Sequence, residues 1–546
     1  MAYTTIDDPT IFFNTIIYTG DGTSKTITGV GFQPDWVWGK GRNSNSAHLL
    51  TDSVRGATKT LYSNATSAEV TSSTASLTGF TSDGYTVDSA SNYNVNSRTQ
   101  VNWNWLAGGS APAITYTVKV VSDSGNKYRF DDFGTSAVTL DLQEGGTYTF
   151  DQSDSSNSGH PLRFSTTSNG THGGGSEYTT GVTTTGTPGY AGAKTVITVA
   201  ASAPTLYYYC TNHSLMGGQA NTNSTFGSSN FSGSIQSTVS AGITQGMSIV
   251  SYTGTGANAT VGHGLGSVPK MIIIKNRDDT DSWRVYHAST GNGGSLMLNL
   301  TNAFASDSTM WNNTSPTSSV FSLGDHDNVN GNSHKFIAYC FAEKKAFSKF
   351  GSYTGNGSTN GTFVYTGFKP AMTIHKNITT SNTYWRIFDN KRSTSGSNVI
   401  DKRLFPSHAE AEDTTNAIDY YSNGFKMRGT SSAENASGAT YIYMAFAESP
   451  FVNSNDVPTN ARWPMMRPLI IGAIIAAILI WFLNGLMDSA MAETNTVSST
   501  VVTNNTPPTA NAPSVVVNNS DVCKTAASVG VQTQILGIAS GITVTD

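Results

Sequence analysis

The chain has 546 residues, which is several domains long on the usual expectation of roughly 100–200 residues per domain. Glycine is abundant, with 54 residues, whereas only 12% of the residues are charged, which is the composition of short strands joined by many turns. The 31 basic and 36 acidic residues leave a net charge of −5 with no basic tract, which argues against nucleic-acid binding. The three cysteines lie far apart, which excludes a dense disulfide framework. We therefore predict an all-β protein.

Three segments of the chain carry the same signals in the same order. Each begins with Tyr-Thr-Gly-x-Gly, continues with a glycine-containing run that leads into an apolar strand, and the last two close on similar runs that end Phe-Ala-Glu. The apolar runs are short, alternate with polar residues and are bounded by Gly, Asn, Asp and Ser, which is typical of β-sandwiches and jelly rolls. We predict three related domains, at residues 11–109, 246–349 and 350–448.

The repeat length of about a hundred residues predicts a string of domains, because solenoid units that share one continuous core have roughly 20–50 residues.

The repeated aromatic residues could stack on sugars, but their alternating strand positions favour core packing. Cys340, in the closing run of the second repeat, is expected to be a buried structural thiol. The aromatic residues in question are Trp36, Trp38, Trp283 and Trp385.

Residues 113–223 interrupt the repeats. They contain two alternating patterns, at 115–121 and 138–150, of which the second includes a Gly-Gly turn. This segment is therefore expected to be an inserted β domain.

The insert contains a short loop with three metal-binding side chains, Cys210, His213 and Met216, directly after a strand at 206–210. Two histidines and a cysteine in a trigonal plane with a weak axial methionine form the blue-copper arrangement, so a second histidine is required. His160, which lies 50 residues before Cys210 and begins an alternating apolar run, is the candidate. His172 is an alternative, although its glycine-rich setting favours an exposed loop histidine.

At these residues the insert resembles the cupredoxin family, which includes plastocyanin and amicyanin. The resemblance rests on the spacing of Cys210-Thr211-Asn212-His213-Ser214-Leu215-Met216 and on the glycine-containing strand at 144–150, and it covers about a fifth of the chain. It implies a Greek-key sandwich with one type 1 copper, whose equatorial ligands are His160, Cys210 and His213 and whose axial ligand is Met216. Pro161 is a departure, because many cupredoxins have at this place an Asn that binds the Cys loop, which leaves the orientation of His160 open.

After the third repeat, the pattern changes. Residues 449–464 form a polar linker, and residues 465–492 contain an apolar stretch that is expected to be helical. This stretch is similar to a signal peptide, because it has a positively charged residue before the apolar run and small residues in Ala-x-Ala order after it. A signal peptide at this place would mark a second reading frame fused to the first. The alternative is a membrane anchor through residues 469–487, which are short for a span. The tail, residues 493–546, is low in complexity and expected to be disordered.

As a set, the repeats and the insert resemble virion structural or tail-fibre proteins of marine tailed bacteriophages, including cyanophages and pelagiphages. The resemblance implies a non-enzymatic display role on the particle surface, with other virion proteins, further copies of the chain and a host glycan or protein as partners. No recognisable hydrolase motif or phosphate-binding loop argues for an enzyme. The alternative function is a membrane-anchored, extracytoplasmic blue-copper protein that transfers electrons.

Overall fold

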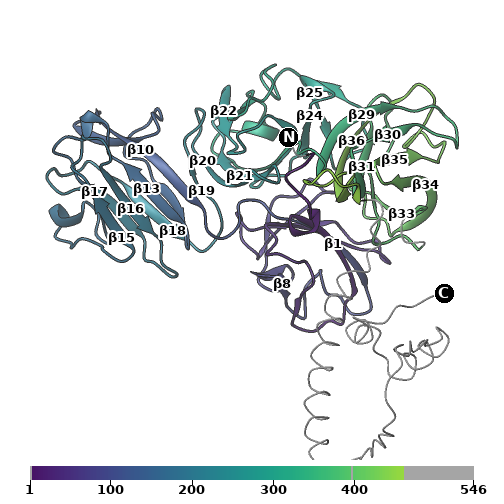
Figure 1. The fold of residues 1–546 in the computed structure, drawn as a ribbon, viewed down its shortest axis with the longest axis horizontal. Coiled ribbons are helices and arrows are strands. Elements are labelled where there is room, and N and C mark those ends of the chain that lie inside the picture. Colours follow the sequence, from purple (N-terminus) through teal and green to yellow (C-terminus); the bar gives the residue numbers. More distant parts are fainter. Residues whose placement is uncertain (1–2, 395–397, 460–546) are drawn as a thin grey trace, which may run out of the picture. The chain divides into compact units, whose positions relative to one another are not determined.

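The structure is a computed structural model that describes residues 3–394 and 398–459. Strands make up 44% and helices 3% of the structure, which confirms the all-β prediction (Figure 1). The predicted apolar helix at 465–492 and the tail at 493–546 lie outside the described residues. Within the described part of the chain, no helix is long and apolar enough to cross a membrane.

The first repeat contains two sheets. Its six-stranded sheet has the order β1-β9-β3-β4-β5-β6, and its three-stranded sheet has the order β2-β8-β7. A short 3-10 helix, η1 (Pro9–Ile11), precedes the first strand. The strands are β1 (Phe13–Thr19), β2 (Lys25–Ile27), β3 (Trp36–Gly41), β4 (Leu49–Asp52), β5 (Lys59–Tyr62), β6 (Val70–Thr71), β7 (Leu77–Thr81), β8 (Gly84–Val87) and β9 (Thr99–Trp105).

The insert is built from a five-stranded sheet, β11-β10-β13-β16-β15, and a four-stranded sheet, β12-β18-β17-β14. Apolar residues of both sheets form one buried cluster between them, as in a sandwich. Two 3-10 helices, η2 (Ser155–Asn157) and η3 (Gly170–Gly173), lie in its loops. The strands are β10 (Ala113–Ser122), β11 (Asn126–Phe130), β12 (Leu140–Gln143), β13 (Thr147–Asp151), β14 (Leu162–Ser165), β15 (Val182–Thr185), β16 (Lys194–Thr198), β17 (Leu206–Cys210) and β18 (Gln219–Asn223).

The second repeat has an eight-stranded sheet, β19-β20-β21-β28-β23-β24-β25-β26, and a two-stranded sheet, β22-β27. A four-residue helix, α1 (Asp327–Asn330), precedes its last strand. The strands are β19 (Ser228–Asn230), β20 (Ser237–Gly242), β21 (Met247–Thr253), β22 (Ala259–Gly262), β23 (Pro269–Asn276), β24 (Arg284–His287), β25 (Gly291–Met297), β26 (Ala305–Ser306), β27 (Val320–Leu323) and β28 (Lys335–Ala342).

The third repeat consists of one eight-stranded sheet, β29-β36-β31-β32-β33-β34-β35-β30. Its two long central strands, β31 and β36, pair antiparallel, with shifts in register near Pro370. The strands are β29 (Ser348–Thr354), β30 (Phe363–Tyr365), β31 (Phe368–Asn377), β32 (Arg386–Asp389), β33 (Ile400–Leu404), β34 (Asp413–Tyr421), β35 (Gly424–Met427) and β36 (Thr440–Pro450).

Each repeat has a core cluster of its own, as expected of a string of domains. In addition, one cluster takes buried side chains from all three repeats, including Trp36, Trp283 and Trp385, which the sequence did not predict. All four repeated tryptophans are fully buried, so the preference for core packing over sugar stacking is confirmed, and Cys340 is a buried free thiol as predicted.

Buried hydrogen bonds join every pair of repeats across this shared cluster. One partner of each bond is the last residue of an equivalent strand, namely Asp52 of β4, His287 of β24 and Asp389 of β32. The bonds join the first repeat to the second, the second to the third, and the first to the third. The bonds are Tyr339 Oη to Asp52 Oδ2 (2.8 Å), His287 Nε2 with the Tyr443 carbonyl (3.2 Å), and Trp103 Nε1 to Asp389 Oδ2 (3.0 Å).

Candidate metal centre

The register of two strands in the insert brings the predicted ligands together. Strands β14 and β17 pair antiparallel, with Leu162 opposite Cys210. His160 comes two residues before Leu162, and Cys210 is the last residue of β17, so both lie at the same end of the strand pair. His213 follows in the loop from β17 to β18 and returns to this end.

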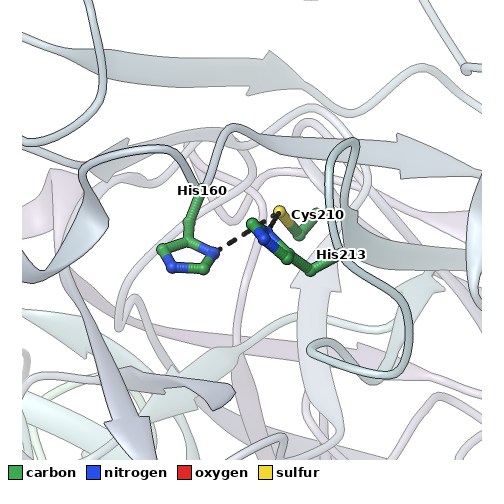
Figure 2. Close-up of side chains that lie close together, drawn as sticks. All are labelled: His160, Cys210 and His213. Carbon is green, nitrogen blue, oxygen red and sulfur yellow. Dashed lines mark hydrogen bonds between the residues drawn. The ribbon is translucent and has the colours of Figure 1, made fainter.

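The two imidazoles approach one sulfur atom at nearly equal distances. Sγ of Cys210 lies 3.8 Å from Nδ1 of His160 and 3.7 Å from Nδ1 of His213, as the dashed lines in Figure 2 show. The three side chains each offer one ligand atom, and these atoms all lie within 4.8 Å of one another. The structure thus brings together three of the four residues predicted as ligands.

These distances match a metal-centred arrangement. Metal–sulfur and metal–nitrogen bonds of roughly 2.3 and 2.1 Å, the values for zinc, separated by about 120° in a trigonal plane, place sulfur and nitrogen about 3.8 Å apart. To bind one cation, Cys210 would act as a thiolate and His160 and His213 as neutral imidazoles, through the sulfur and the two Nδ1 atoms that lie in contact.

The ligand loop has a fixed backbone. A Cβ atom on Gly217 would lie 1.7 Å from the carbonyl oxygen of Tyr208, so only glycine fits there. Leu215 has a left-handed backbone with φ of 61°, and its N–H donates to the Asn169 side chain. The amide of Asn212 donates to the Gly159 carbonyl at 2.9 Å, which ties the loop to the segment that carries His160.

The backbone of His160 is held by hydrogen bonds from two side chains. Its carbonyl accepts hydrogen bonds from the Tyr128 hydroxyl at 2.8 Å and from the Gln152 amide at 2.9 Å. The oxygen of the same Gln152 amide accepts from the N–H of Leu162, so Gln152 holds the chain on both sides of His160. The carbonyl of Pro161 accepts from the N–H of Thr211 at 3.1 Å, which provides the link to the Cys loop that an Asn side chain makes in many cupredoxins.

The ligands differ in exposure. Cys210 is fully buried, His160 is half-buried and His213 is exposed. Desolvation lowers the pKa of His160, and the neighbouring His213 lowers it further, which favours the neutral imidazole that a metal requires. Burial raises the pKa of Tyr128 far above its ordinary value, and the proximity of Cys210 adds to this, so Tyr128 remains a neutral donor.

Met216 and His172 both lie at the surface depression beside the ligands, which Asn126, Asn212, His213 and Ser214 also line. The Met216 side chain is buried in the same apolar cluster as Cys210. Nε2 of His172 lies 3.1 Å from the Cys210 carbonyl, so this histidine contacts the backbone of the ligand loop. It is not part of the His160, Cys210 and His213 group within the described residues.

The donor set fits copper better than the hard cations. A thiolate, two imidazoles and a thioether are soft or borderline ligands, whereas magnesium and calcium require oxygen donors. The residues present therefore fit a soft or borderline metal ion.

A comparison with protein families identifies the scaffold that carries this centre. Residues 8–136 and 219–450 match a family described as a domain of unknown function, DUF7483. The chain belongs to the DUF7483 family. The match omits residues 137–218, which contain His160, Cys210, His213 and Met216. The candidate ligands thus lie outside the segments that match the family. No curated protein and no solved structure matches the chain.

In this DUF7483 member, three residues hold the segment that carries His160. The sequence analysis did not identify them. Tyr128 and Gln152 fix His160, and the buried Asn157 accepts the His160 N–H through its carbonyl and donates to the Val118 carbonyl at 2.7 Å. Gln152 and Asn157 are buried amides in or beside the polar loop that precedes His160. Their burial in an otherwise exposed loop would have indicated that these amides support His160. Burial cannot be seen in a single sequence.

Proposed function

We propose that the insert binds one copper ion in a type 1 site and that this protein is a non-enzymatic structural protein of a phage particle, which displays the copper domain on a body of three β repeats. The observation that supports copper binding is the convergence of His160 and His213 on Cys210, at 3.8 and 3.7 Å. The copper would accept and release one electron at the centre.

The residues of the centre are suited to hold the ion with little rearrangement. Gly217, Gln152 and Tyr128 fix the two loops before any ion binds, so the ligand geometry is preorganised. The buried sulfur of Cys210 is kept from water, while the edge of His213 reaches the surface. Electrons would therefore enter and leave at the His213 side of the insert.

The display role is supported by the construction of the rest of the chain. Three repeats that share a buried cluster and are joined in every pair by hydrogen bonds form a rigid support. The DUF7483 match omits residues 137–218, which contain the four candidate ligands, but it includes the insert strands β10, β11 and β18. This role implies three kinds of partner: other virion proteins, further copies of this chain, and a host glycan or protein.

The second candidate is an extracytoplasmic, membrane-anchored blue-copper protein that transfers electrons. The exposure of His213 favours it, since a surface ligand gives a redox partner access to the centre. The two candidates differ in location. Mass spectrometry of purified particles is expected to detect peptides of this chain, and their absence from particles but presence in host membranes would favour the second candidate.

Copper binding is tested by its colour. The full chain loaded with Cu(II) is expected to show the intense thiolate-to-copper charge-transfer absorption, and Cys210→Ser is expected to lose it. Cys340→Ser is the matched control, because this buried thiol lies in the second repeat and has no part in the centre. A colourless wild-type protein that takes up no copper would overturn the proposal.

A further inference from the structure

The third repeat exposes three aromatic side chains on one face of its sheet. Phe363 and Tyr365 lie on β30 and are 45% and 54% exposed. Tyr421 ends β34 and is partly exposed. Strands β30 and β34 are labelled in Figure 1. We call these three residues the aromatic platform. Clustered exposed aromatic residues in a soluble protein commonly mark a binding site.

Strand pairing places the platform residues side by side. Gly424 of β35 pairs with Tyr365 on one side and with Tyr421 on the other. Because residues opposite each other point to the same face of a sheet, the two tyrosines flank a residue without a side chain. The ring of Phe363 lies over this glycine, 3.1 Å from where a Cβ would be, and meets the Tyr421 ring edge-to-face at 6.1 Å.

The first repeat shows that the fold does not require these aromatic residues. The buried Val364, between Phe363 and Tyr365, pairs with Phe425, just as Ile27 of the first repeat pairs with Tyr85. The two residues that flank Ile27 are Thr26 and Thr28, both exposed. At the position of Tyr421, which pairs with the glycine before Phe425, the first repeat has Thr81, which pairs with Gly84.

The second repeat leads to the same conclusion. There the buried Val261 pairs with Phe321, and its neighbours are Thr260 and Gly262. Three copies of one unit therefore keep the inner residue of this strand apolar, whereas only the third copy has large aromatic residues on the outer face. Since the inner packing is common to all three, the platform is an addition that serves something other than folding.

Polar groups surround the platform. The Tyr365 hydroxyl lies 3.1 Å from the hydroxyl of Tyr3. The Tyr421 hydroxyl donates to Asp419 at 3.3 Å, and Arg428 donates to the same carboxylate oxygen at 2.6 Å, although its side chain remains 41% exposed. Hydroxyl, carboxylate and guanidinium groups are thus oriented at the edge of an apolar surface.

We propose that the aromatic platform of the third repeat binds a saccharide. A pyranose ring has one face of C–H groups, which packs on aromatic rings, and a rim of hydroxyls, which require hydrogen-bond partners at the edge. Phe363 and Tyr421 would supply the apolar contact, and the exposed part of the Arg428 guanidinium, which the buried Asp419 holds in place, would bond the hydroxyls. The proposal goes beyond the copper centre and does not depend on it, because the insert contributes none of these residues.

The test uses the full chain and an immobilised panel of oligosaccharides that contain hexoses, deoxyhexoses, N-acetylhexosamines and uronic acids. Wild-type protein is expected to be retained by at least one of them. The triple variant Phe363→Thr, Tyr365→Thr and Tyr421→Thr is expected to bind it about tenfold more weakly or worse, since a loss of roughly 1.4 kcal/mol corresponds to tenfold. Threonine stands at the matching positions of the first repeat, so the sheet accepts it.

Tyr190→Thr is the control, because this tyrosine is 66% exposed but lies in the insert, and it is expected to bind like the wild type. An unchanged circular dichroism spectrum and an unchanged copper colour would show that the triple variant is folded. If the wild type binds no saccharide of the panel, or if the folded triple variant binds as well as the wild type, the proposal is wrong. Loss of binding with the copper colour retained would support it independently of the copper centre.

Discussion

The indole nitrogen of Trp103 donates a 3.0 Å hydrogen bond to Oδ2 of Asp389, although the two residues belong to the first and the third repeat. The same carboxylate oxygen accepts from the guanidinium of Arg392, whose plane lies 5.4 Å from the Trp103 ring. The buried ion pair of Asp389 and Arg392 thus lies at the junction of the first and third repeats. Removing either partner is expected to destabilise the fold, because a buried charge without its partner is costly.

The ion pair at this junction is therefore expected to be sensitive to mutation. Arg392 is fully buried and is paired with Asp389 and Glu412. Arg392→Met leaves the buried Asp389 without its cation, whereas Glu412 keeps its pair with Arg42, and is expected to lower the free energy of unfolding by about 3–5 kcal/mol. Lys349→Met, which breaks the partly exposed pair with Glu343, is expected to cost no more than about 1 kcal/mol. Urea unfolding measures both, and equal losses would contradict the prediction.

His287 is expected to make the protein sensitive to acid. Burial lowers its pKa from 6.5 to about 4, and its Nε2 lies 3.2 Å from the Tyr443 carbonyl. The unfolded chain therefore takes up this proton at higher pH, so the stabilisation present above pH 6.5 is lost as the pH falls towards 4, by about 3 kcal/mol. In His287→Gln, the free energy of unfolding should fall less steeply over this interval.

The control for the acid experiment is His408→Gln, since the side chain of His408 is 43% exposed. This variant is expected to keep the slope of the wild type. The measurement is urea unfolding at a series of pH values from 7 to 4. A slope that is the same in the wild type and in His287→Gln would show that this histidine does not contribute to acid sensitivity.

The conformation of the ligand loop depends on Gly217. A Cβ atom there would overlap the carbonyl of Tyr208, at 1.7 Å, and neither backbone can move without disturbing β17. Gly217→Ala is expected to lower the free energy of unfolding of the insert by about 1–3 kcal/mol and to weaken copper uptake. Gly134→Ala, in the same insert, has nothing within 4 Å of the new Cβ and is expected to be neutral. Thermal unfolding distinguishes the two, and a stable Gly217→Ala would refute the prediction.

Gln152 is expected to affect the metal although it does not touch it. Its amide bonds the His160 carbonyl at 2.9 Å and the Leu162 N–H at 3.1 Å, so Gln152→Ala frees the segment that carries His160. Loss of such a supporting group typically costs about 10–100-fold in metal affinity. Competition with a copper chelator measures the affinity. Gln219→Ala, whose amide contacts only the Asn221 side chain, is the control and is expected to keep the wild-type affinity.

The all-β fold could be predicted from the sequence, because strands depend on local signals. Alternation of apolar residues and the recurrent Tyr-Thr-Gly-x-Gly can be read within a few residues. The contacts between repeats could not be predicted in this way. Trp283 donates to the carbonyl of Tyr62, 221 residues away, and an apolar strand residue carries no sign of the partner on which it packs.

The candidate centre shows the same division. Cys210, His213 and Met216 were found because they share one loop, and His160 was found through the expected ligand set. The supports of His160 were missed, since Tyr128 and Gln152 reach it from other strands and resemble ordinary core and edge residues in the sequence. Pro161 raised a doubt about the orientation of His160, and the structure shows that its carbonyl accepts a hydrogen bond from the N–H of Thr211 in the Cys loop.

X-ray absorption at the copper edge of the loaded full chain tests the central claim most directly, because it counts the atoms bound to the metal. The spectrum is expected to show one sulfur and two nitrogen neighbours at bonding distance, from Cys210, His160 and His213, and Cys210→Ser is expected to lose the sulfur. A wild-type spectrum with only nitrogen and oxygen neighbours would contradict the account.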